Sequence, residues 1–87
     1  MMHNIPKDQI TNEHSVYVFL QHKSICKLIQ QTDNTYQWID IFEKTLKEKV
    51  FFQTIQQAIE DVEKIPDIEI HAFLSTTEAK NFIKSKL

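Results

Sequence analysis

The sequence predicts a single α+β domain over residues 1–87, with a mainly antiparallel sheet of four to five strands and two amphipathic helices. Two observations lead to this class. Short runs of β-branched and aromatic residues, separated by a few polar residues, indicate strands joined by tight links. Two later segments, about 54–64 and 75–86, each begin near a hydroxyl side chain and carry apolar residues at helical spacing.

The first strand is expected over residues 15–21, because Val16 to Leu20 is an unbroken run of apolar residues rich in β-branched and aromatic side chains. A strand that is apolar on both faces belongs in the interior of a sheet. The preceding residues 1–14 are polar apart from Ile5 and Ile10, so we expect a loosely ordered arm there.

Residues 24–31 fit a strand, although Ile25, Leu28 and Ile29 would also share one face of a helix. We favour the strand, because the turn-forming residues 33–35 (Asp-Asn-Thr) would then join it to the next strand as a hairpin. The helical alternative gives the order β-α-β-β-α-β, which is the split βαβ arrangement.

Three more strands complete the predicted sheet. Residues 36–43 alternate, with Tyr36 and Trp38 on one face. Residues 49–53 are expected to return antiparallel across a short charged link. Residues 67–73 alternate between two sets, which are Ile68, Ile70 and Ala72 on one side and Glu69, His71 and Phe73 on the other.

Both predicted helices begin with the spacing of a capping box, in which a hydroxyl and a side chain three residues later satisfy backbone N–H groups. The pairs are Thr54 with Gln57 and Ser75 with Glu78, and Pro66 ends the first helix. Each helix carries one apolar stripe, formed by Ile55, Ala58, Ile59 and Val62 in the first and by Ala79, Phe82, Ile83 and Leu87 in the second.

The composition excludes several classes of function. The chain has no glycine, which removes glycine-rich phosphate loops and nucleophile elbows. Its one cysteine, Cys26, cannot form an internal disulfide, so nothing indicates secretion. No apolar run approaches the length of a membrane span, and no signal segment opens the chain. We therefore expect a cytoplasmic protein without a membrane association.

Residues that could carry metal or nucleophilic chemistry are scattered. The candidates are His3, His14, His22, Cys26 and His71, and they show no close pair of the kind that structural zinc sites use. Cys26 with His22 or His71 could form a thiolate and its base, but a lone cysteine between apolar residues is more typical of a core position. We expect no metal, no cofactor and no enzymatic activity.

A nucleic-acid interface is the first alternative for function. Tyr17, Phe19, Tyr36 and Trp38 could stack with the bases of a single strand on the sheet surface. However, all ten basic residues are lysine, the net charge is −2, and arginine is absent. Arginine makes most of the forked contacts to phosphate and guanine, so these observations argue against a nucleic-acid partner.

Two features favour a protein partner instead. A sheet that is apolar on both faces, with two short helices to cover it, would leave aromatic side chains partly open. Acidic residues on the polar face of the first helix could form a ridge that meets a basic surface or imitates a phosphate backbone. The same carboxylates would also serve simply as the solvated face of that helix. The predicted partner-binding residues are Tyr17, Tyr36, Trp38, Glu60, Asp61 and Glu63.

The sequence thus predicts a non-enzymatic binding module that acts by covering a partner's surface. An inhibitor or neutralising protein of the phage, mobile-element or toxin-immunity type fits this description. The alternatives are an accessory protein that binds single-stranded nucleic acid, and a structural homo-oligomer built by pairing open sheet edges.

Overall fold

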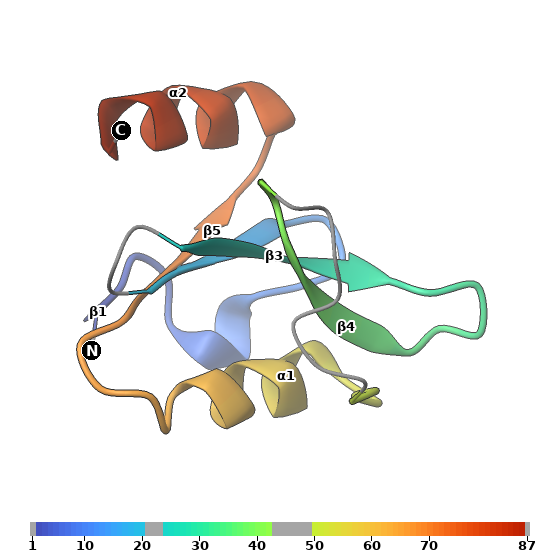
Figure 1. Cartoon of the computed structure of the whole chain (residues 1–87). Helices are drawn as coiled ribbons and strands as arrows, with labels where there is room; N and C mark the ends of the chain where they lie inside the picture. The colour runs from blue at the N-terminus through green and yellow to red at the C-terminus, as the bar shows by residue number, and fades with distance from the viewer. Residues whose placement is uncertain (1, 21–23, 43–49, 87) are drawn as a thin grey trace.

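A computed structural model describes residues 2–20, 24–42 and 50–86. These residues form a five-stranded sheet with one helix against each face (Figure 1). In chain order the elements are β1 (Met2–His3), the 3-10 helix η1 (Lys7–Gln9), β2 (Ser15–Phe19), β3 (Ile25–Gln30), β4 (Tyr36–Asp40), α1 (Ile55–Val62), β5 (Glu69–Phe73) and α2 (Thr76–Lys86).

The strand order across the sheet is β1-β5-β2-β3-β4. The four longer strands pair antiparallel, and the two-residue β1 pairs parallel with β5. The predicted α+β class and the predicted strand number are therefore confirmed. Because Ile25–Gln30 is strand β3, the helical alternative for residues 24–31 is wrong.

The predicted hairpin turn joins β3 to β4. The Asp33 carboxylate accepts hydrogen bonds from the Thr35 hydroxyl (2.6 Å) and from the Thr35 backbone N–H (3.1 Å). Both bonds favour the charged form and lower the pKa of Asp33. Asn34 takes a left-handed backbone conformation (φ 68°), which asparagine tolerates better than most residues. In a chain without glycine, these local side-chain bonds close the turn.

The strand predicted over residues 49–53 is reduced to a single bridge among the described residues. Phe52 and Tyr36 exchange two backbone hydrogen bonds, of 2.8 and 2.9 Å. Residues 43–49, which include the ends of two predicted strands, lie outside the described residues, as does residue 21 at the end of the first. The antiparallel bridge at Phe52 places the segment around this residue beside β4, on the side predicted for a returning strand.

The hydroxyl half of each predicted capping box forms. The Thr54 hydroxyl accepts a hydrogen bond from the Gln57 N–H (3.1 Å), and the Ser75 hydroxyl accepts one from the Glu78 N–H (3.2 Å). The Gln57 amide oxygen accepts in return from the N–H of Gln53 (3.1 Å), one residue before the cap itself. Within the described residues, neither helix has the length and apolarity needed to cross a membrane.

The alternating strands divide the core into two layers. The larger layer lies between the sheet and α1, and the smaller lies between the sheet and α2 (Figure 1). Buried residues of the α1 layer include Val16, Val18, Cys26, Leu28, Tyr36, Trp38, Ile55, Ala58, Ile59, Val62, Ile68, Ile70 and Ala72. Those of the α2 layer are Tyr17, Phe19, Ile25, Phe73 and Ala79. The side chains that the two-residue period assigned to one face of β4 and of β5 lie in the same layer of the core.

Residues 2–14, expected to be a loose arm, are tied to the fold by side-chain amides. The Asn4 amide donates to the carbonyl of Ala72 (2.9 Å) and accepts from its N–H (2.8 Å), which extends the pairing of β1 along β5. The Gln56 amide of α1 donates to the carbonyl of Ile10 (3.0 Å), whose side chain is buried. These bonds connect residues far apart in sequence, which local polarity could not indicate.

Candidate functional site

The predicted aromatic anchors on β4 are core residues. Trp38 is 5% exposed, and its indole Nε1–H donates to the carbonyl of Ala58 in α1 (3.1 Å). Tyr36 is 8% exposed, and its hydroxyl donates to the Asn12 side chain (2.5 Å). The expectation of an open sheet face around Tyr36 and Trp38 is therefore wrong, because α1 packs directly over it.

Tyr17 lies on the opposite face of the sheet from these two residues. Its ring packs edge-to-face with Phe73 at 5.8 Å, and the Lys27 Nζ lies 5.8 Å from the ring centroid. Burial raises the pKa of Tyr17. The three predicted aromatic residues are thus distributed over two core layers and do not form one surface.

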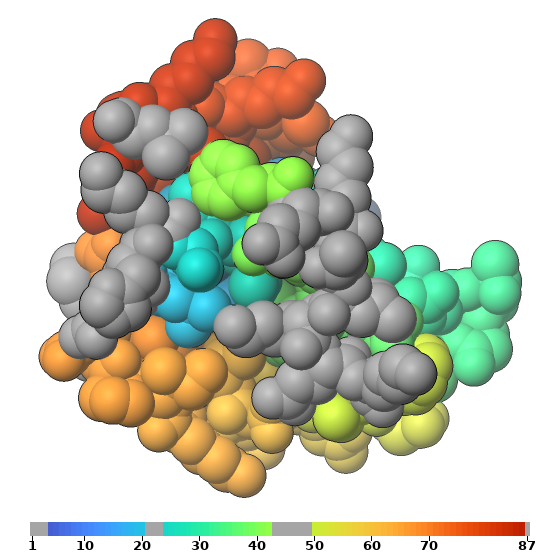
Figure 2. Space-filling model, viewed as in Figure 1, coloured from blue at the N-terminus to red at the C-terminus, as the bar shows by residue number. Residues whose placement is uncertain are grey.

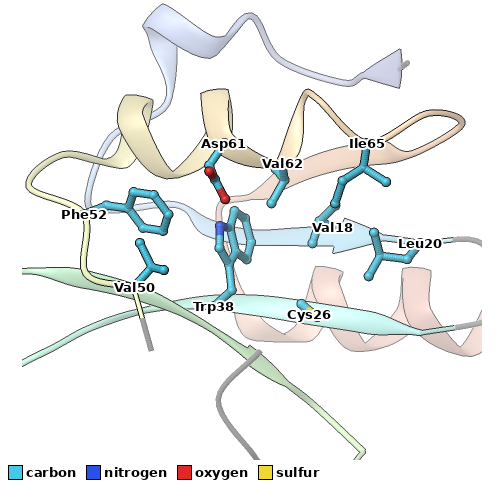
Figure 3. A pocket seen from close by; sticks show the side chains of 9 residues that line it. All are labelled: Val18, Leu20, Cys26, Trp38, Val50, Phe52, Asp61, Val62 and Ile65. Atoms are coloured by element: carbon cyan, nitrogen blue, oxygen red, sulfur yellow. The ribbon is translucent and has the colours of Figure 1, made fainter. Parts of the chain in front are cut away.

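The predicted acidic ridge is divided between two environments. The Lys7 Nζ of η1 lies 3.2 Å from a Glu63 carboxylate oxygen and 3.4 Å from one of Glu60. The hydrogen bond to Glu63 is the main cause of a raised pKa of Lys7. Asp61 is the residue after Glu60 in α1, and it lines a cleft between α1 and the sheet (Figure 3).

This cleft encloses about 40 Å³ and is lined mostly by apolar side chains. Val18 and Cys26 are paired on neighbouring strands, and their small side chains leave room beside the Trp38 indole. Figure 3 shows side chains from the sheet and from the α1 side converging on the same space. The lining residues are Val18, Leu20, Cys26, Trp38, Val50, Phe52, Asp61, Val62 and Ile65.

Apolar side chains at the mouth of the cleft reach solvent. Val50 and Ile65 line the cleft and are 41% and 38% exposed. Phe51, next to Val50 in sequence, is 56% exposed. On the face drawn in Figure 2, blue-to-cyan atoms of β2 and β3 remain visible between the orange segment after α1 and the green end of β4. We call Val50, Phe51 and Ile65 the apolar rim.

The sequence pattern contained one signal for this rim. Val50, Phe51 and Phe52 are three consecutive apolar residues in an extended segment. Alternation then places the middle side chain on the opposite side from the other two, so a half-buried strand cannot cover all three. Ile65 had no such signal, because its position follows the end of α1 and depends on how the chain turns towards β5.

The candidate residues for catalysis do not converge in the part of the chain that the structure describes. Cys26 is buried in the α1 layer, whereas the His71 ring lies in the α2 layer, 4.4 Å from the ring centroid of Phe82. His22 lies outside the described residues. In the part of the chain that the structure describes, no three His, Cys, Asp or Glu side chains gather into a potential metal site.

Comparison with known proteins assigns no relative. No protein-family model matches the chain, and neither the curated proteins nor the solved structures give a significant match. Any functional proposal therefore rests on the cleft, the apolar rim and the charges beside them.

Proposed function

We propose that this protein is a non-enzymatic binding module that covers a surface of a protein partner, with the apolar rim at the centre of the contact. The observation that carries this proposal is the exposure of Val50 and Ile65, which line one cleft, together with that of Phe51, which follows Val50 in the chain. Exposed apolar side chains grouped around a concavity are typical of interaction sites, and aromatic residues are frequent anchors there.

The charges beside the rim favour a partner with a basic surface. Asp61 and the rim residue Ile65 line the same cleft, whereas Glu60 is paired with Lys7. Opposite charges across an interface accelerate encounter and select the partner more than they add affinity. A small cytoplasmic inhibitor or neutralising protein, of the phage, mobile-element or toxin-immunity type, is the class we propose.

The nucleic-acid alternative receives less support from the same geometry. Stacking with bases needs accessible rings, and the four aromatic residues named for that role are between 5% and 8% exposed. These residues are Tyr17, Phe19, Tyr36 and Trp38. A second copy of the chain is the other candidate occupant of the rim, and light scattering of the purified protein distinguishes a dimer from a monomer.

Affinity capture from the native host tests the proposal. The matched variants are Phe51→Asp in the rim and Leu74→Asp, which changes another exposed apolar side chain just before α2 (56% and 70% exposed). We expect the partner to be retained by the wild type and by Leu74→Asp. Phe51→Asp should weaken its affinity at least tenfold, or about 1.4 kcal/mol.

Circular dichroism of each variant provides the control for folding. If folded Phe51→Asp captures the same partner with unchanged affinity, the rim is not the contact and the proposal fails.

A further inference from the structure

The cleft combines two kinds of surface. Its walls are apolar, and Asp61 is the one charged side chain among the described residues that line it. In Figure 3 the Asp61 carboxylate stands on the α1 side of the cleft, facing the space beside the Trp38 indole. An occupant that suits both surfaces must carry an aliphatic portion and a positive charge.

Asp61 differs from its acidic neighbours in its charge environment. Lys7 bridges Glu60 and Glu63 on the η1 side of the helix. Among the ion pairs between described residues, none includes Asp61. In the described part of the chain no cationic side chain pairs with its carboxylate, whereas the two glutamates share Lys7.

The size of the cleft limits the shape of the occupant. A volume of about 40 Å³ is more than the ~10–15 Å³ that one water needs. It is well below the roughly 150 Å³ cavity that admits benzene. A slender methylene chain therefore fits better than an aromatic ring or a planar guanidinium group.

We propose that the cleft receives a lysine side chain of the protein partner. The methylene groups of that lysine contact the walls at Leu20 and Val62, and its ammonium group pairs with the Asp61 carboxylate near the face of the Trp38 indole. This inference rests on the proposed function, because it names the group by which the partner is recognised.

Two other occupants fit less well. A leucine or methionine side chain would bring apolar atoms against the Asp61 carboxylate and remove water from that charge without a compensating bond. An arginine side chain carries a wider and more rigid head group than a primary ammonium. Lysine meets both the size and the charge of the site.

The n-butylammonium ion reproduces the side chain of lysine and serves as the probe, with 1-butanol as an uncharged probe of similar length. Each is titrated into ¹⁵N-labelled protein, and the indole N–H of Trp38 gives one distinct signal because the chain has a single tryptophan. We expect saturable shifts of this signal and of the amides near Val62. The affinity for n-butylammonium should exceed that for 1-butanol at least fivefold.

Two variants assign the charge effect to one carboxylate. Asp61→Asn should reduce the affinity for n-butylammonium to that for 1-butanol. Glu60→Gln removes an equal charge one residue away and should leave the affinity within twofold of the wild type. As a measurement that needs no variant, added NaCl should weaken the binding of n-butylammonium and leave the binding of 1-butanol unchanged.

Three results would overturn the lysine assignment: no saturable shift at Trp38, equal affinity for the two probes, or equal losses in the two variants. Failure of the lysine assignment can be distinguished from failure of the proposed binding function. If n-butylammonium fails to bind but Phe51→Asp still loses the partner, the binding module stands without a lysine-specific cleft. If n-butylammonium binds but Phe51→Asp retains the partner, the cleft stands and the rim contact fails.

Discussion

At the scale of single residues, the burial of the aromatic side chains determines what each can do. Trp38 donates its indole N–H to the Ala58 carbonyl in the α1 layer, and its ring also forms one wall of the cleft. Phe51, in contrast, adds little to the core, because more than half of its surface is exposed. We therefore expect substitution of Trp38 to lower the stability of the fold, and substitution of Phe51 to weaken partner binding while it leaves stability nearly unchanged.

Replacing Trp38 by Phe removes the hydrogen bond to Ala58 and part of a buried ring. We expect the free energy of unfolding to fall by about 1–3 kcal/mol, measured by urea denaturation. Phe51→Ala is the matched control at an exposed ring, and it should change stability by less than about 0.5 kcal/mol. A destabilised Phe51→Ala together with an unaffected Trp38→Phe would reverse the assigned roles.

Single residues also show how far sequence reasoning reaches. The two-residue period assigned the side chains of β4 and β5 to the correct faces, and the caps at Thr54 and Ser75 were found from their spacing. Periodicity does not say which face another element covers, so the exposure expected at Trp38 was wrong. The contacts of Asn4 with β5 span 68 residues, and no local pattern could indicate them.

At the scale of elements, the two helices differ in how firmly they hold the sheet. Four residues of α1 are buried (Ile55, Ala58, Ile59 and Val62), whereas Ala79 is the buried residue of the described part of α2. Phe82 and Ile83 of α2 are partly buried against the smaller layer. We therefore expect α2 to open locally before α1 does.

The cap of α1 should matter to the whole fold. Thr54→Ala removes the oxygen that accepts the Gln57 N–H and should lower the free energy of unfolding by about 1 kcal/mol. Thermal denaturation provides the measurement, and Thr54→Ser, which keeps the hydroxyl, is the matched control. If the serine and alanine variants lose the same stability, the hydroxyl is not the cause.

The attachment of α2 should depend on pH through one ion pair. Lys86 in α2 lies 2.7 Å from a Glu69 carboxylate oxygen in β5, and this hydrogen bond lowers the pKa of Glu69. A lowered pKa in the folded state means that the stabilisation is present above the pKa of the unfolded chain. It is lost as the pH falls through the lower, folded value.

We therefore expect amide exchange in α2 to accelerate on acidification below the ordinary pKa of glutamate, relative to exchange in α1. The effect should be modest, because partly exposed ion pairs contribute roughly 0.2–1 kcal/mol. Glu69→Gln should remove this pH dependence while it leaves that of α1 unchanged. An identical acid response in the variant would assign the effect to another group.

At the scale of the whole molecule, the fold exposes two of its apolar side chains, Val50 and Ile65, at one cleft beside α1, whereas Leu74 is exposed before α2. Strand pairing and the two helices bury the aromatic residues of the sheet, and the segments around Val50 and Ile65 bring the apolar rim to the cleft. The acidic residue Asp61 lies at the same place. This coincidence of an apolar rim, a cleft and a carboxylate is the basis of the proposed binding function.

The most direct test of that function is to map the interface on ¹⁵N-labelled protein titrated with the captured partner. We expect the amides of residues 50–52 and 61–65 and the Trp38 indole to shift or broaden, and those around Leu74 and along α2 to remain unchanged. Perturbations confined to α2 and the sheet face beneath it, with the rim unaffected, would contradict the account.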